Sequence, residues 1–188
     1  MRLDRRGLMQ AGLVGAAVLT TGLPMAAPKR NLKKSLKMGM INDPNAKTIK
    51  ERLQVAKNAG FVGVEPDYIF DDQTAREMKA AADELGLVLD AIICPTHWGS
   101  PLSDPDPKVV DQTMEGMEIC LKNAKTIGAD TVLLVPAVVT PTVSYQDAYT
   151  RSLARVKELA VIAERLGVTI GLENVWNKFL LSPLEFRR

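Results

Sequence analysis

Polar side chains that could bind a ligand or a metal ion follow several apolar segments of the sequence. Glu173 and Asn174 come directly after the apolar run 167–172, with no turn residue between. A carboxylate at such a strand end would be partly withdrawn from water, and it can bind a divalent metal, transfer a proton, or do both. The structural alternative is a hydrogen bond to a loop backbone, and position alone does not separate the two.

His97 is the single histidine of the sequence, and it stands beside Trp98 in a proline-rich loop after the apolar run 87–93. A lone histidine is often an ordinary core or surface residue. A tryptophan beside it can shield a ligand from water, so we expect His97 and Trp98 to contact a substrate. One histidine does not suffice for a polynuclear zinc site.

Other strand-end residues have both a structural and a functional interpretation. Glu65 follows an apolar run and precedes Pro66, and it could contact a substrate or a metal or, more commonly, hold neighbouring loops. Asn174 and Asn177 could bond to ligand hydroxyl groups or cap the loop. Trp176 could stack on a substrate or close the end of the fold. The remaining polar residues at strand ends are Asn42, Asp43 and Asp67.

The elements that must position these residues repeat one phrase: an Ala, three residues, a Gly, then an apolar run. The four glycines are Gly60, Gly86, Gly128 and Gly167. A left-handed residue at a helix end costs least without a Cβ atom, so each phrase predicts a helix leading into a strand. The nearly all-apolar strands are typical of a parallel sheet buried on both faces. We predict a first strand at 36–41, a third at 87–93, and helices near 47–58, 74–85, 107–127 and 145–166.

Two architectures accept this βα repeat: a doubly wound sheet, or the first part of an eight-unit barrel. No Gly-rich phosphate loop follows the first strand, which disfavours a nucleotide-binding doubly wound fold. A complete barrel needs roughly 250 residues. We therefore expect an α/β fold, a partial (β/α)8 TIM barrel of about five strands and four to five helices, with Ser182 and Pro183 beginning another helix.

The N-terminal residues do not belong to this body. Residues 1–27 combine Arg5-Arg6, an apolar centre interrupted by glycines, and a small-residue end, which predicts a twin-arginine-like export signal and a periplasmic protein. A membrane-spanning helix is the alternative, but the apolar stretch is short and ends at Pro24, so we expect no stable membrane span. A basic linker at 28–35 and the barrel at 36–188 follow.

The charge distribution argues against nucleic acid as a partner. Residues 1–37 hold eight Lys or Arg against one acidic residue, whereas residues 38–188 hold sixteen against twenty-one. The body is therefore acidic, although the formal net charge of the whole chain is +2. Cys94 and Cys120 are too few for a disulfide framework and are expected to be buried free thiols.

Three features together resemble the sugar phosphate isomerase/epimerase superfamily with the xylose isomerase-like TIM barrel, in particular the ketose 3-epimerases. They are Glu65 after the 60–64 segment, the His97-Trp98 loop, and the segment 171–179, GLENVWNKF. The resemblance covers residues 36–188 but only the first part of the family's barrel. It implies 3-epimerisation of a ketose or ketose phosphate by proton transfer through an enediolate.

The resemblance also implies one divalent metal ion, Mn²⁺ or Mg²⁺, held by two Glu, an Asp and a His. Glu173 matches the first of these ligands and one of two acid/base groups; the other ligands would lie beyond Arg188, and His97 does not match the ligand His. We therefore expect the 188-residue chain alone to be inactive and aggregation-prone. Assembly of the full-length protein into a homo-oligomer stays open.

Other functions share this scaffold. Hydroxypyruvate isomerase and inosose dehydratase activities remain open, because a fold does not fix a substrate. An exported, non-catalytic carbohydrate-binding barrel is an alternative from another class. An endonuclease-IV-like DNA repair enzyme would need several metal-binding histidines and a basic groove, so the single histidine and the acidic body argue against it.

Overall fold

The computed structural model describes residues 32–68 and 71–187. The chain divides into two compact units, Met1–Leu32 and Lys33–Arg188, and the fold belongs to the second. The export signal expected at 1–27 lies outside the described residues. No helix within the described ranges is long and apolar enough to cross a membrane.

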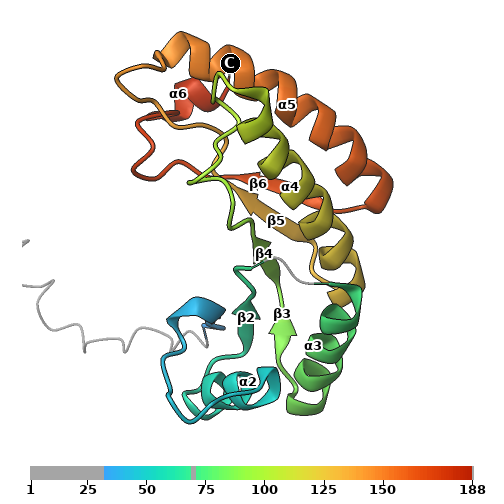
Figure 1. The fold of residues 1–188 in the computed structure, drawn as a ribbon. Coiled ribbons are helices and arrows are strands. Elements are labelled where there is room, and N and C mark those ends of the chain that lie inside the picture. The colour runs from blue at the N-terminus through green and yellow to red at the C-terminus, as the bar shows by residue number, and fades with distance from the viewer. Residues whose placement is uncertain (1–31, 69–70, 188) are drawn as a thin grey trace, which may run out of the picture. The chain divides into compact units, whose positions relative to one another are not determined.

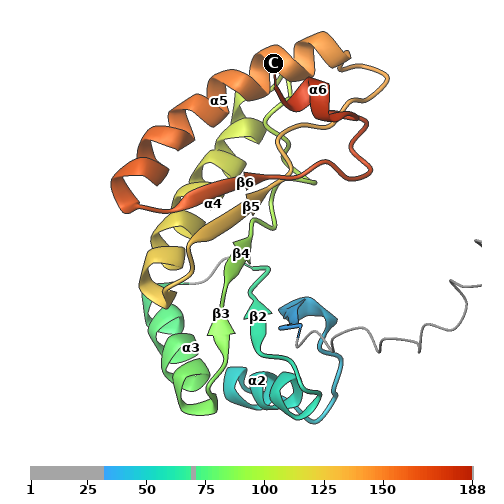
Figure 2. The ribbon, with the colours of Figure 1, turned by 180° about the vertical axis from the view of Figure 1, so that it is seen from behind.

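The strands are short and all their pairings are parallel. They are β1 (Ser35–Lys37), β2 (Gly63–Glu65), β3 (Val88–Leu89), β4 (Ala91–Ile93), β5 (Thr131–Leu134) and β6 (Thr169–Leu172). They pair in chain order, β1-β2-β3 and β4-β5-β6, as Figures 1 and 2 allow the reader to follow. A doubly wound sheet reverses its strand order at a switch point, and neither of these three-stranded sheets does. Pairing in chain order is the winding of a TIM barrel.

The strand predicted at 87–93 is divided at Asp90 into β3 and β4. β3 pairs with β2, whereas β4 pairs with β5, so the chain changes its pairing partner at this residue. The Asp90 carboxylate accepts a hydrogen bond from Ser35 Oγ at 2.7 Å. The Ile93 N–H donates to the Pro66 carbonyl at 2.8 Å, which keeps β4 beside the chain that leaves β2.

Helices follow the strands as the glycine phrases predict. They are α2 (Ile49–Asn58), α3 (Asp72–Leu85), α4 (Pro107–Ile127), α5 (Tyr145–Leu166) and the short α6 (Pro183–Phe186). Figures 1 and 2 show α3, α4 and α5 on the same side of the strands. All four predicted helix-ending glycines have a positive φ, between +64° at Gly86 and +81° at Gly60 and Gly128. These positions confirm the repeat.

The first strand is shorter than the predicted 36–41. It ends at Lys37 and is followed by a turn of 3-10 helix, η2 (Met38–Met40). The Gly39 N–H donates to Asp67 Oδ1 at 3.0 Å instead of to a neighbouring strand. Arg52 Nη2 donates to the Met38 carbonyl at 2.7 Å. These two bonds turn the chain away from the sheet, and the sequence pattern does not show them.

Burial on both faces of the sheet, which the sequence favoured, is not what the structure has. Alternate strand residues face the helices and are buried, among them Val64, Ile92 and Val132. Val88 points the other way and is 58% exposed, because no described element covers that face at its position. Leu172 is 38% exposed for a different reason, since β6 pairs only with β5 among the described strands.

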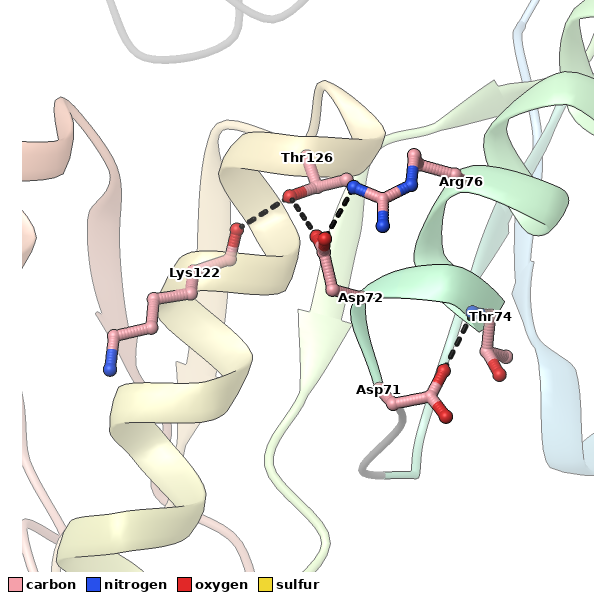
Figure 3. A network of polar contacts seen from close by, with 6 residues as sticks. All are labelled: Asp71, Asp72, Thr74, Arg76, Lys122 and Thr126. Carbon is pink, nitrogen blue, oxygen red and sulfur yellow. Dashed lines mark hydrogen bonds and ion pairs between the residues drawn. The ribbon is translucent and has the colours of Figure 1, made fainter.

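The N-terminus of α3 is tied to the C-terminal end of α4 by polar contacts (Figure 3). Asp71 caps α3 by accepting a hydrogen bond from the Thr74 N–H at 2.7 Å. Asp72 pairs with Arg76 one turn later and accepts a long hydrogen bond of 3.4 Å from Thr126 on α4. Of these contacts, the bond between Asp72 and Thr126 is the one that joins the two helices. The expected free thiols are both buried: Cys94 directly follows β4, and Cys120 lies on α4.

Candidate functional site

A cavity of about 300 Å³ lies at the carboxyl ends of the strands. Four of the residues predicted from the sequence line it: His97, Trp98, Glu173 and Trp176. They come from the loop after β4 and the loop after β6, which flank the end of β5 because β4 and β6 pair with its two edges. Glu65, Asn174 and Asn177 do not line this cavity.

His97 is buried, with 3% of its surface exposed. The Val135 N–H donates to its Nδ1 atom at 3.3 Å, so the ring of the neutral side chain carries its proton on Nε2. Burial lowers the pKa of His97 to about 4, and the positive charge of Lys37 adds to this effect. His97 is therefore a neutral hydrogen-bond donor near pH 7 rather than a proton-transfer acid.

Glu173 extends the β5–β6 pairing before its side chain reaches the cavity. Its N–H donates to the Leu134 carbonyl at 3.1 Å, which fixes the direction of the backbone at the strand end. The residue is exposed, and the expected partial desolvation is therefore wrong. The reason is that β6 is an edge strand in the described residues, so nothing covers the carboxylate on its outer side.

Glu65 lies at the end of β2, outside the lining of the cavity but near it. Burial raises the pKa of Glu65, and the negative charges of Asp90 and Glu173 raise it further. Three carboxylates therefore lie close enough to interact, on three different strand ends. The interaction with Asp90 is a repulsion between like charges, so the structural role that the sequence favoured for Glu65 stays a prediction.

The two tryptophans of the sequence both line the cavity, and both are exposed. Trp98 is 45% exposed and packs edge-on against His97, with ring centroids 5.6 Å apart. Trp176 is 90% exposed, so in the described residues it does not close the end of the fold by packing. Large exposed aromatic rings beside a cavity are typical of surfaces that contact ligands.

Asn177 is fully buried, and its side chain holds two loops together. Its amide Nδ2 donates to the Ala137 carbonyl at 3.0 Å, and its Oδ1 accepts from the Val175 N–H at 3.0 Å. The capping role that the sequence left open therefore accounts for this residue. Asn174 is exposed and lies outside the cavity lining.

Lys37 and Asp67 also line the cavity. The sequence pattern grouped Asp67 with the polar strand-end residues but placed Lys37 inside a strand, and so missed it. Lys37 Nζ lies 3.2 Å from Asp67 Oδ2. The signal that could have identified Lys37 is the glycine two positions later, which marks an early end of the strand.

The described residues do not form a complete metal site. No group of three or more His, Cys, Asp or Glu side chains within the described ranges is arranged to hold a metal ion. Glu173 is an exposed carboxylate of the type that Mn²⁺ and Mg²⁺ prefer, but one ligand does not define a site. Any further ligands come from outside these residues.

A parallel sheet wound in chain order, with its polar residues gathered at the carboxyl ends of the strands, defines the class of TIM-barrel proteins. Within that class, the chain belongs to the xylose isomerase-like TIM barrel family, whose sequence model matches residues 53–188. The resemblance inferred from the sequence is thereby confirmed at the level of the family. No curated protein sequence matches the chain significantly.

Solved structures of similar fold include sugar epimerases. The 3-keto-D-glucoside 4-epimerase of E. coli, in its apo form, is 19% identical, with a TM-score of 0.62 over 77% of this chain and 57% of its own. A D-psicose 3-epimerase from Clostridium cellulolyticum H10, solved with D-tagatose, is 22% identical, with a TM-score of 0.61 over 78% and 54%. A D-allulose 3-epimerase from Methylomonas sp., in complex with D-allulose, is 21% identical, with a TM-score of 0.61 over 80% and 54%. The chain spans little more than half the length of these structures, and at such identities the likeness shows the fold alone.

Proposed function

We propose that this chain carries part of the active site of a sugar isomerase or epimerase that acts on a ketose or ketose phosphate. The observation that carries the proposal is the position of Glu173, at a strand end of a barrel of this family and in one cavity with His97 and both tryptophans. The family includes epimerases of similar fold, which supports the reaction class. The particular sugar is not part of the proposal.

In this proposal Glu173 transfers the proton at the carbon next to the sugar carbonyl. The exposed carboxylate accepts the proton, and the C–H electron pair moves toward the carbonyl oxygen to give an enediolate. His97 donates a hydrogen bond from Nε2, and the tryptophans cover the sugar. Inversion at carbon requires a second proton-transfer group on the opposite face, and that group would come from outside the described residues.

A divalent ion, Mn²⁺ or Mg²⁺, belongs to the proposal only as a partner of Glu173 in the complete gene product. Such an ion would stabilise negative charge on the sugar oxygens when bound. The described residues form no group of three or more possible ligands, so no step is assigned to the ion here.

The test is deuterium incorporation by the complete gene product that contains these residues. The protein is incubated with D-tagatose, D-fructose or D-psicose and Mn²⁺ in D₂O, and the sugar is analysed by NMR. Deuterium at the epimerised carbon together with the epimer supports the proposal. Glu173→Gln should lower the rate by at least about 1,000-fold, whereas Glu115→Gln, an exposed residue on α4, serves as the matched control. Equal rates for both variants would remove Glu173 from the mechanism.

The second candidate is an exported barrel that binds carbohydrate without catalysis. One observation favours it: two exposed tryptophans lie beside the cavity. Calorimetric binding of a ketose without deuterium exchange, and with Glu173→Gln binding as tightly as the wild type, would select this function.

Export to the periplasm remains part of the proposal and rests on the sequence of residues 1–27. Fractionation of cells that express the wild type and an Arg5→Lys/Arg6→Lys double variant tests it. The twin-arginine interpretation requires that the wild type reach the periplasm and that the double variant stay in the cytoplasm.

A further inference from the structure

A lysine at the end of β1 lines the cavity, and the proposed function assigns it no role. Lys37 is the last residue of β1, and its Nζ atom lies 3.2 Å from Asp67 Oδ2. The lysine side chain is 46% exposed, whereas the Asp67 side chain is only 15% exposed. Lys37 is the only lysine or arginine among the described residues that line the cavity.

Asp67 is held in place from the backbone. The Gly39 N–H donates to its Oδ1 atom at 3.0 Å, while its Oδ2 atom faces Lys37. A Cβ atom at position 39 would overlap Oδ2, so glycine is what allows this close approach. Both carboxylate oxygens therefore have a defined partner, and the position of the lysine ammonium is set in advance by Asp67.

His97 presents a second donor to the same cavity. Its Nδ1 atom is occupied by the Val135 N–H, and no described residue pairs with Nε2. The described ranges contain no buried polar side-chain atom without a hydrogen-bond partner, so Nε2 must reach the solvent-filled cavity. Lys37 and His97 both line this cavity, so the two donors face the same space.

We propose that Lys37 and the Nε2–H of His97 together bind the carbonyl oxygen of an open-chain sugar, and that Asp67 is a positioning residue for Lys37. The inference rests on the proposed function and adds two hydrogen-bond donors for the developing charge on this oxygen, besides the divalent ion. When Glu173 takes the proton, an O–H bond forms on its carboxylate, the C–H bond breaks, and the electron pair passes into the new C=C bond. The carbonyl electrons then move onto the oxygen, whose negative charge faces the ammonium and the imidazole N–H.

The experiment uses the complete gene product with Mn²⁺ and the ketose that it turns over. Lys37→Met removes the charge and keeps the length of the side chain, and Lys108→Met, at an exposed position of α4, is the matched control. We expect Lys37→Met to lower kcat by about 100-fold, the typical loss for one donor to a developing oxyanion. Calorimetric affinity for the corresponding alditol, which has no carbonyl group, should change by less than roughly 3-fold, because a donor to the carbonyl contributes little to its binding.

A double-mutant cycle separates positioning from general structure. Asp67→Asn should lower kcat by roughly 10-fold, and the Lys37→Met/Asp67→Asn double variant should be no slower than Lys37→Met alone. Additive losses would overturn the positioning role of Asp67. The role of Lys37 would be overturned if the kcat of Lys37→Met lay within roughly 3-fold of the wild-type value. It would also be overturned if this variant lost equal affinity for the ketose and for the alditol. A wild type that neither binds nor converts any ketose refutes the proposed function instead, so the two failures are distinguishable.

Discussion

Acidification is expected to destabilise this fold through its single histidine. Burial of His97 in the cavity wall, helped by the charge of Lys37, holds its folded-state pKa at about 4, against an ordinary value of 6.5. The unfolded chain therefore binds a proton in a pH range where the folded chain does not. The stability that His97 contributes is fully present above about pH 6.5 and is lost as the pH falls toward 4.

The magnitude follows from the difference between the two pKa values. Each pH unit between them is worth ~1.4 kcal/mol, so the wild type should lose about 3 kcal/mol of unfolding free energy from this group between pH 7 and pH 4. Other groups titrate in the same range. The pKa values of Glu51, Asp71 and Glu185 are lowered by hydrogen bonds, and that of Glu65 is raised by burial, so the wild type alone does not isolate the effect.

His97→Asn isolates it, because the Asn side-chain oxygen can still accept the Val135 N–H but does not titrate. Denaturant unfolding of the wild type and the variant is measured between pH 7 and pH 4, and the difference in unfolding free energy is plotted against pH. We expect the difference to change by about 3 kcal/mol over this range, to the disadvantage of the wild type at low pH. NMR titration of the imidazole resonance that is absent from the variant gives the folded-state pKa directly.

Two results would refute the reasoning. A folded-state pKa near 6.5 would mean that the imidazole is hydrated, in conflict with its 3% exposure. A pH-independent difference between the wild type and the variant would mean that no proton is taken up at His97 on unfolding.

The remaining predictions concern the support of the site. Asn177→Ala should lower the unfolding free energy by about 2–4 kcal/mol in denaturant titrations, because a buried carbonyl and a part-buried N–H lose their partner. Asn58→Ala at an exposed helix end should cost less than roughly 1 kcal/mol. Equal costs would show that Asn177 does not hold the loops. Gly39→Ala should displace Asp67 and reduce kcat as Asp67→Asn does. Gly99→Ala is the control, because a Cβ atom at position 99 meets open space, and it should leave kcat unchanged. Similar kcat values for the two variants would contradict the close approach at Gly39.

The helices were predictable because their signals are local. The helix predicted at 107–127 is α4 as observed, with Asp106 as its cap, Pro107 in the first turn and Gly128 in the left-handed conformation at its end. Each of these residues acts within a few positions of itself, so the sequence contains the whole argument. The same holds for α5, between the Ser144 cap and Gly167.

The strand ends were less predictable, because their limits depend on residues far away in the chain. The first strand ends at Lys37 because the Gly39 N–H donates a hydrogen bond to Asp67 and the Met38 carbonyl accepts one from Arg52. The division at Asp90 likewise depends on which neighbour each half pairs with. For this reason the sequence located Glu173 at a strand end but missed Lys37.

The sequence by itself determined the βα repeat, the family of the barrel and five of the strand-end residues that line the cavity, namely Asp67, His97, Trp98, Glu173 and Trp176. Hydrophobic patterning and helix-ending glycines suffice for that, since they act over one element at a time. Only the tertiary structure decided that the strands pair in chain order, that Asn177 is held inside the fold and that His97 is a neutral donor beside an anchored lysine. Those properties depend on burial and on charges brought together from distant parts of the chain, and no local pattern contains them.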